Sequence, residues 1–213
     1  MIRLLSFIYP ITKKVKSEFN GTLEITWYNG KKYLNTKNAN YSYGSLQKIL
    51  KTGLQKIDLS DCKNVLILGF GGGSVIKTLR KDFSYRENIT AVDIDPVIIK
   101  IAKEEFNVSK FENLEIICDD AFKFVEKNNK RYDLIIVDLF IDTEIPSPFY
   151  QIPFWENIIK ASSDEASILF NASLDSKNDT KITNIASFLF KNKFQVEKLE
   201  KVNKTNTLLI AKR

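Results

Sequence analysis

The sequence predicts an α/β fold in which a doubly wound, mostly parallel sheet of seven strands follows a small N-terminal β-unit. Three features of the 213-residue chain predict it. From residue 64 onward, short apolar runs alternate with helical patterns, as in repeated βα units. A glycine-rich turn at residues 69–73 separates the first apolar run from the first helical pattern. The last two strand-like runs are expected to form an antiparallel hairpin, which is a departure from a plain dinucleotide-binding fold.

The first 60 residues have a different pattern from the rest of the chain. Residues 21–27 alternate apolar and polar side chains, and Asn29-Gly30 is a strong signal for a hairpin turn. Residues 31–35 return as the partner strand. The predicted parts are a small β-hairpin unit with a linking helix at residues 1–60 and a larger domain at residues 61–213.

Strands and helices are expected to alternate through the larger domain. Each strand prediction rests on a short run rich in apolar and β-branched residues, and each helix on apolar residues at helical spacing. Pro96 in a first turn, with Asp95 before it, supports one helix start, and Asp119 or Asp120 is expected to cap the next helix. The predicted strands are 65–68, 89–93, 114–118, 132–138, 166–171, 194–199 and 205–211, and the predicted helices are 41–55, 96–106, 121–127, 154–161 and 179–191, with one more from residue 75.

The composition excludes several classes of chemistry. The chain has no histidine and two cysteines, Cys62 and Cys118, without C-x-x-C spacing. Histidine-dependent catalysis is therefore excluded, a disulfide framework or structural zinc is not expected, and carboxylates, Tyr and Lys remain for proton transfer. The net charge of +6 is spread over lysine-rich surface segments and does not indicate nucleic acid. We expect a cytoplasmic protein with no membrane segment, no metal and a small-molecule partner.

The glycine turn is the first part of a predicted ligand site. Residues 65–68 fit a strand buried on both faces, and the glycines that follow lack the side chains that would block a ligand. Free N–H groups and the helix dipole after the turn attract negative charge or lone pairs. The alternative is that the glycines only close a tight turn. The turn residues expected to bind a nucleotide-type cofactor are Gly69, Gly71, Gly72 and Gly73.

Acidic residues follow three other strands at the same predicted edge of the sheet. Ligands bind beyond the carboxyl ends of the strands in an open parallel sheet. Asp93 ends the second strand, where it either accepts hydrogen bonds from ribose hydroxyls or caps a helix. Of Asp119 and Asp120, one is expected to be a helix cap and the other to contact a ligand. Asp138 follows the fourth strand, as a turn former or a catalytic group. Together the acids predict one site.

The glycine turn alone does not separate NAD from S-adenosylmethionine. Its G-x-G-x-x-S spacing, with Ser74 in place of a third glycine, is a weak dinucleotide match. The acid at the third strand end, placed for an adenine amino group, and the closing hairpin favour an adenosyl-sulfonium cofactor. A dehydrogenase also usually needs a proton-transfer residue, and histidine is absent. An NAD-dependent oxidoreductase and a non-catalytic nucleoside-binding protein stay as alternatives.

At five places the sequence resembles the spermidine synthase family, which has the Rossmann-like fold of S-adenosylmethionine-dependent methyltransferases. V-L-I-L-G-F-G-G-G-S at 65–74 resembles its glycine turn, and A-V-D-I-D at 91–95 its ribose-binding segment. D-D-A-F-K-F at 119–124 resembles the segment near the adenine. Y-D-L-I-I-V-D at 132–138 resembles its catalytic strand, and Y-S-Y-G-S-L at 41–46 a segment at its amine pocket.

The resemblance implies roles for individual residues. It implies that Asp138 orients and deprotonates an attacking amine, with Tyr43 at the mouth of the amine pocket. Asp142 or Glu144 is expected to hold a second positive group, and Tyr150 to cover cofactor or substrate through its ring. The residues implied at the ribose and adenine of the cofactor are Asp93, Ile94, Asp120 and Ala121.

Departures from the family pattern bear on the reaction. The family has an acid where this chain has Gly72, and there it pairs with the ammonium of decarboxylated S-adenosylmethionine. A neutral turn suits S-adenosylmethionine itself, so methyl transfer to a small amine is favoured and aminopropyl transfer stays open. Gly44 replaces a glutamine after the pocket tyrosine, and the segment after Asp138 is longer. By analogy with the family, the hairpin near Trp27 and Tyr28 is expected to pair in a homodimer.

Overall fold

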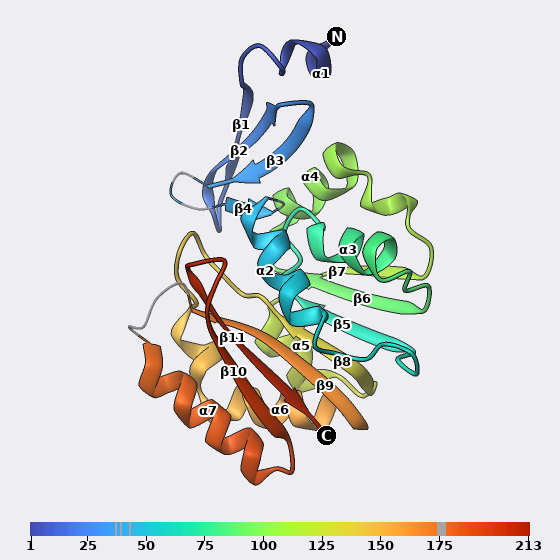
Figure 1. The fold of residues 1–213 in the computed structure, drawn as a ribbon, viewed down its shortest axis with the longest axis vertical. Helices are drawn as coiled ribbons and strands as arrows, with labels where there is room; N and C mark the ends of the chain where they lie inside the picture. Colours follow the sequence, from blue (N-terminus) through green and yellow to red (C-terminus); the bar gives the residue numbers. More distant parts are fainter. Residues whose placement is uncertain (37, 39, 43, 174–177) are drawn as a thin grey trace.

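The computed structural model describes residues 1–36, 38, 40–42, 44–173 and 178–213, which form two sheets (Figure 1). The small sheet is an antiparallel meander with the strand order β1-β2-β3-β4. A short helix, α1 (Ile2–Leu5), lies at its outer tip. The strands of the small sheet are β1 (Ile11–Ser17), β2 (Gly21–Tyr28), β3 (Lys31–Asn35) and β4 (Asn40–Ser42).

The large sheet has seven strands in the order β10-β11-β9-β8-β5-β6-β7. Neighbours from β9 to β7 pair in parallel, whereas β11 pairs antiparallel with both β9 and β10. This confirms the predicted doubly wound sheet with a closing hairpin. The order of the chain reverses between β8 and β5, where sheets of this kind bind ligands. The strands are β5 (Asn64–Leu68), β6 (Asn88–Asp93), β7 (Leu114–Cys118), β8 (Tyr132–Val137), β9 (Ser162–Ser173), β10 (Gln195–Val202) and β11 (Asn206–Lys212).

Helices cover both faces of the large sheet (Figure 1). In β5, Leu66 and Leu68 pack in the core with α5, α6 and α7, while Val65 and Ile67 pack with α2, α3 and α4. All four side chains are buried, as predicted for a strand covered on both faces. Among the described residues, no helix is long and apolar enough to cross a membrane. The helices are α2 (Ser45–Leu54), α3 (Ser74–Asp82), α4 (Pro96–Phe106), α5 (Ala121–Lys127), α6 (Ile152–Ala161) and α7 (Asp179–Lys191).

The predicted bounds agree with the structure for β3, β7, α4, α5 and α7, and the other predicted elements are present with ends that differ by one to four residues. The helix expected from residue 41 begins at Ser45, because residues 40–42 pair with β3 as β4. Strand β9 begins at Ser162 and not at residue 166. Helix α2, predicted as a link, packs on the large sheet through Ile49, Leu50 and Leu54. A domain boundary at residue 60 stays a prediction.

The sequence did not predict β1, because lysines hide its apolar positions. Lys13, Lys14 and Lys16 are exposed, whereas Ile11 and Val15 are half-buried. Strand β1 is an edge strand of the small sheet. Charged side chains are a common protection of such an edge against pairing with another chain.

The small sheet packs on α4 through an apolar cluster. Leu23, Ile25 and Leu34 of the small sheet lie in one buried cluster with Ile98 and Ile101 of α4. Full burial of side chains of this size contributes about 1.5 to 3 kcal/mol each. This cluster therefore fixes the small sheet beside the large one.

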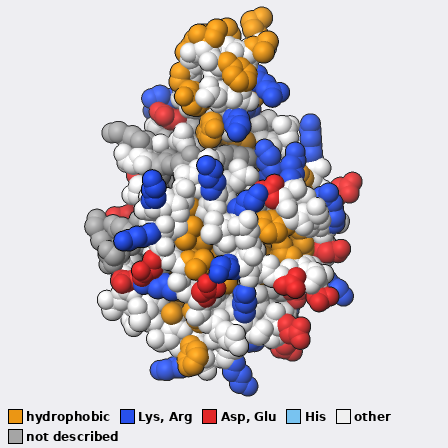
Figure 2. Space-filling view, in the orientation of Figure 1, with side chains coloured by type: hydrophobic (Ala, Val, Ile, Leu, Met, Phe, Trp, Pro, Cys, Tyr) orange, Lys and Arg blue, Asp and Glu red, His pale blue; other side chains and the backbone are white. Residues whose placement is uncertain are grey.

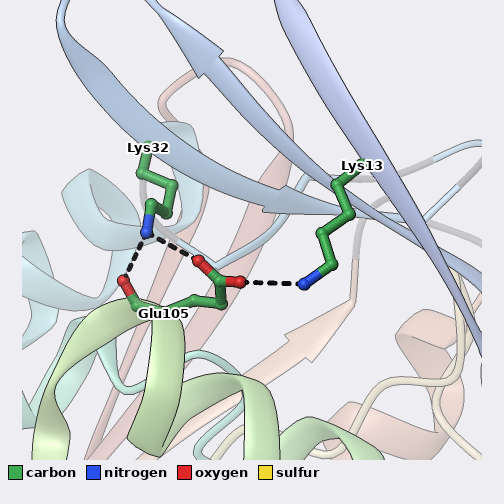
Figure 3. A network of polar contacts seen from close by, with 3 residues as sticks. All are labelled: Lys13, Lys32 and Glu105. Carbon is green, nitrogen blue, oxygen red and sulfur yellow. Dashed lines mark hydrogen bonds and ion pairs between the residues drawn. The ribbon is translucent and has the colours of Figure 1, made fainter. Parts of the chain in front are cut away.

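Polar contacts hold the small sheet at the carboxyl end of α4 (Figure 3). The Lys32 Nζ lies 2.8 Å from a carboxylate oxygen of Glu105 and donates to its carbonyl at 2.8 Å. The Lys13 Nζ lies 3.2 Å from the other carboxylate oxygen. The hydrogen bond from Lys32 lowers the pKa of Glu105. Because Lys32 is mostly buried and Lys13 is exposed, the first pair contributes more.

Asp95 holds the small sheet at the other end of α4. Its Oδ1 accepts from the backbone N–H of Val97 at 2.9 Å, which confirms the predicted helix cap. Its Oδ2 accepts from the Ser17 hydroxyl and, at 2.7 Å, from the Asn20 amide. Asp95 is fully buried. One carboxylate therefore caps α4 and fixes the turn between β1 and β2.

Candidate functional site

A cavity of about 630 Å³ opens at the carboxyl ends of the parallel strands. Its walls come from the segments after β5, β6, β7 and β8, and from α2, the β1–β2 turn and Asn38 of the small-sheet region. This is the switch point of the sheet, and the volume is in the usual range of small-molecule sites. The predicted site residues that line the cavity are Gly69, Gly71, Asp93, Ile94, Asp120, Ala121, Asp138 and Asp142.

Three predicted site residues have a different place. Gly72 and Gly73 are not among the described residues that line the cavity, and neither is Tyr150. The Tyr150 hydroxyl donates to the carbonyl of Ala172 at 2.7 Å, and its ring packs edge-on against Phe170 in the core. Tyr43 lies outside the described residues. The expected amine-site tyrosines therefore stay predictions.

The glycine turn brings two strands together through close backbone contacts. Gly69 has φ +79°, and a Cβ there would lie 2.3 Å from the carbonyl oxygen of Asp138. Gly73 has φ +83° at the start of α3, and its Cβ would lie 2.3 Å from Val108. A Cβ at Gly72 would meet the Ser42 side chain at 3.0 Å. Of these glycines, Gly69 faces the cavity wall, while Gly72 and Gly73 allow other elements to pack on the turn.

Asp93 links the end of β6 to the glycine turn. One carboxylate oxygen accepts from the N–H of Gly71 at 3.1 Å, and the other from the N–H of Asp95 at 3.1 Å. Burial raises its pKa to about 7, although backbone hydrogen bonds from Asp95, Gly71 and Phe70 act in the opposite direction. An ionised carboxylate has about four acceptor sites, so it can still accept from a ribose hydroxyl.

Asp120 combines the two roles that the sequence assigned to neighbouring acids. It is the N-cap of α5, since its Oδ1 accepts from the Lys123 N–H at 3.0 Å, and it also lines the cavity. Asp119 instead accepts from the N–H of Asp120 at 2.8 Å. The expectation that one acid caps the helix and the other lines the site is therefore wrong: Asp120 does both.

Asp138 lies directly after β8, and its N–H donates to the Leu68 carbonyl at 2.9 Å. Its Oδ1 accepts from the amide nitrogen of Asn171 at 2.8 Å. Burial raises the pKa of Asp138 to about 6, and the hydrogen bond from Asn171 opposes this rise. A carboxylate with a pKa near neutrality is suited to take a proton from a substrate.

Asp142 ties the segment after β8 to the small-sheet region. Its two carboxylate oxygens accept from the Thr36 hydroxyl and, at 2.7 Å, from the Asn38 amide. These hydrogen bonds, from Thr36 first, lower the pKa of Asp142. Asp142 thus stays ionised beside the cavity and anchors one of its walls.

Sequence reasoning missed four asparagines that line the cavity, of which Asn38 is the partner of Asp142 described above. Asn20 donates to Asp95, and its own Oδ1 is buried with no hydrogen-bond partner among the described residues. Asn171 and Asn206 are fully buried and hydrogen-bonded to each other at 2.8 Å. A polar residue at the carboxyl end of an apolar strand was the available signal for Asn171. Asn20 and Asn206 gave no comparable signal.

The cavity has a negative lining in a positively charged chain. Among the described residues that line it, four are acidic and one, Lys123, is basic, against a net charge of +6 for the whole sequence. Carboxylates in a low-dielectric cavity attract cations more strongly than exposed ones do. The arrangement favours a ligand that carries positive charge.

Residues 47–202 match the spermine/spermidine synthase domain. The chain belongs to this family. It is 42% identical over 90 residues to a polyamine aminopropyltransferase of Sulfolobus acidocaldarius, which is 39% of this chain and 29% of that protein. Across the first three such relatives the chain spans between 21% and 37% of their length.

Solved structures agree with this fold assignment. The spermidine synthase of Thermotoga maritima superposes with a TM-score of 0.60 at 16% identity, over 96% of this chain and 72% of that one. Human methyltransferase-like protein 13, in complex with SAH, superposes with a TM-score of 0.62 at 18% identity, over 79% and 82% of the two chains. At these identities the likeness shows the methyltransferase fold alone, which confirms the predicted fold class.

In this spermine/spermidine synthase family member, Gly69→Ala is expected to destabilise the fold more than Gly21→Ala. Both glycines have positive φ, but nothing lies within 4 Å of a Cβ at Gly21. Gly21→Ala is therefore expected to cost about 1 to 2 kcal/mol. In Gly69→Ala the new Cβ also clashes with the Asp138 carbonyl oxygen, so the expected loss of stability is about 3 to 5 kcal/mol. Urea unfolding of the two variants measures this, and equal losses would contradict it.

Proposed function

We propose that this protein transfers an alkyl group from an adenosyl-sulfonium cofactor of the S-adenosylmethionine type to a small amine. The observation that carries the proposal is the meeting of the glycine turn, Asp93 and Asp138 in one acid-lined cavity. Cofactor and ammonium substrate are both cationic at the reacting end, and the lining is negative. The family supports the same class of reaction.

The cavity fits the nucleoside part of such a cofactor. Asp93 offers lone pairs to ribose hydroxyls, and Ile94, Ala121 and Phe122 supply apolar surface for an adenine. Asn20 lines the same wall, and its amide nitrogen donates to Asp95 at 2.7 Å, which holds this part of the wall in place.

The chemistry asks little of the protein beyond alignment. The cofactor supplies an alkyl carbon that is already activated by its bond to positive sulfur. The amine nitrogen forms a bond to that carbon while the carbon–sulfur bond breaks. The electron pair of the carbon–sulfur bond stays on sulfur, which becomes a neutral thioether. Asp138 holds the ammonium form of the amine, takes its proton and aligns the neutral nitrogen. Asp142, which stays ionised, is suited to hold a second positive group.

The comparisons favour aminopropyl transfer from decarboxylated S-adenosylmethionine as the specific reaction. Relatives from several bacteria and archaea carry the name polyamine aminopropyltransferase. The comparisons do not specifically support methyl transfer, which the sequence favoured. Methyl transfer remains the second candidate because Gly72 leaves the turn without the family's acid.

Methylthioadenosine is expected to bind more tightly as the pH rises from 6 to 8. Ribose hydroxyls donate to the ionised form of Asp93, and with a pKa of about 7 its ionised fraction increases about tenfold over this range. Affinity is therefore expected to increase up to about tenfold. Calorimetry of wild type, Asp93→Asn and the exposed control Asp164→Asn measures it. Asp93→Asn is expected to bind methylthioadenosine weakly and with an affinity that does not change with pH. If its affinity changes with pH as that of wild type does, Asp93 is not the group responsible. The absence of binding by any adenosyl ligand or NAD would overturn the proposed function.

Asp138→Asn is expected to lower turnover by at least about a hundredfold while methylthioadenosine affinity changes less than about threefold. Wild-type kcat/KM is expected to fall below pH about 6, where Asp138 becomes protonated. Mass spectrometry of products from putrescine with each donor identifies the transferred group. Aminopropyl products are expected, and methyl products alone would favour the second candidate. Turnover unchanged in Asp138→Asn would remove Asp138 from the mechanism.

We also propose that the N-terminal tip pairs two copies in a homodimer. Large apolar side chains are exposed there, and Figure 2 shows the apolar atoms gathered at the tip of the molecule. Leu4 is 73% exposed and Ile8 is 80% exposed.

The double variant Leu4→Lys/Ile8→Lys is expected to sediment as a monomer of 24.5 kDa, whereas wild type is expected to sediment as a dimer. Phe190→Lys, at a site 71% exposed on α7, is the control. A monomeric wild type would contradict the proposal.

A further inference from the structure

We propose that Asn171 and Asn206 are positioning residues that fix the Asp138 carboxylate and aim its Oδ2 into the cavity. The two residues come from neighbouring strands, since Asn171 lies in β9 and Asn206 begins β11. Both line the cavity with Asp138. The inference rests on the proposed function, because it assigns Asp138 a partner for the reaction described above.

The hydrogen bonds run in one direction, toward Asp138. The Thr205 hydroxyl lies 2.7 Å from Asn206 Oδ1, and Asn206 Nδ2 donates to Asn171 Oδ1 at 2.8 Å. Asn171 Nδ2 then donates to Asp138 Oδ1 at 2.8 Å. An ionised carboxylate only accepts, so Asn171 must present its nitrogen to Asp138 and its oxygen to Asn206. Asn206 must in turn present its nitrogen, and the Thr205 hydroxyl donates.

Burial makes this arrangement rigid. Asn171 and Asn206 expose at most 1% of their surface. A flipped Asn171 amide would place its oxygen against the Asp138 carboxylate and leave a buried nitrogen without an acceptor, which is strongly unfavourable. Asn206 therefore acts on Asp138 through Asn171. Its function is to hold the orientation of that amide.

The pair leaves one carboxylate oxygen for the substrate. Within the described part of the chain, the hydrogen bond that the Asp138 side chain accepts from the protein goes to its Oδ1. Oδ2 is thus the atom available to an ammonium group. Asn171 and Asn206 are uncharged and do not titrate themselves. The charged groups that share the cavity with Asp138 are Asp93, Asp120, Asp142 and Lys123.

The hydrogen bond from Asn171 also favours the ionised form of Asp138, in opposition to burial. Without it, the pKa of Asp138 is expected to rise. This consequence separates a positioning role from simple packing, since a side chain of similar volume that cannot donate keeps the packing and loses the effect. Leucine is such a replacement for asparagine.

Carboxyl ¹³C NMR titration of Asp138 in the full chain tests the inference without turnover, with the Asp138→Asn spectrum for assignment. Asn171→Leu is expected to raise the pKa of Asp138 by about one unit, and Asn206→Leu and Thr205→Val by less. Asn88→Leu, exposed at the far end of β6, is the matched control and should leave it unchanged. If Asn171→Leu does not fold, Asn206→Leu and Thr205→Val, the latter at an exposed position, carry the test. An unchanged Asp138 pKa in the folded variants overturns the inference.

Kinetics supplies the second readout. Asn171→Leu is expected to lower kcat about tenfold or more with little change in cofactor KM, and Asn171→Leu/Asn206→Leu to be no slower than Asn171→Leu alone. Additive losses would show that Asn206 does not act through Asn171. If wild type lacks turnover with any sulfonium donor, the proposed function fails while the titration still decides the positioning role.

Discussion

The backbone contact between Gly69 and Asp138 is the constraint on which the site depends. The N–H of Asp138 donates to Leu68 at 2.9 Å, and the N–H of Gly69 donates to Val92 at 2.8 Å, so the turn is held between β8 and β6. A Cβ at position 69 has no room beside the Asp138 carbonyl. This close approach places the acids that end β6 and β8 on one cavity, although they lie far apart in the sequence.

The small-sheet region completes the cavity through two carboxylates of the large domain. Asp95 accepts from Ser17 and Asn20, and Asp142 accepts from Thr36 and Asn38. Hydrogen bonds to charged groups are stronger than those between neutral groups, so these contacts fix the walls on both sides of the cavity. A chain without this region would keep the glycine turn and Asp138. It would lose the buried Asn20 acceptor and the anchor of the segment after β8.

The parts of the fold that local sequence determines were predictable. The start of helix α4 was predictable because Asp95 and Pro96 are a cap and a first-turn residue, and β5 because it is apolar on both faces. Strand β4 and the start of α2 were not predictable, since residues 40–42 become a strand only by pairing with β3. The acids at the strand ends were predictable from the parallel order. The amides that orient them were not, because Asn206 reaches Asn171 from a different strand.

The geometry at Gly72 changes what its missing acid means. From the sequence, a neutral turn selects S-adenosylmethionine over its decarboxylated form. In the structure, a Cβ at this position would begin 3.0 Å from the Ser42 side chain of β4 and 3.4 Å from Leu34. Position 72 is therefore where the small sheet packs on the turn, and a side chain there requires Ser42 to move by a few tenths of an ångström. The packing of the small sheet is thus a second reason for a glycine at position 72, and Gly72 is a weaker argument for methyl transfer than the sequence made it.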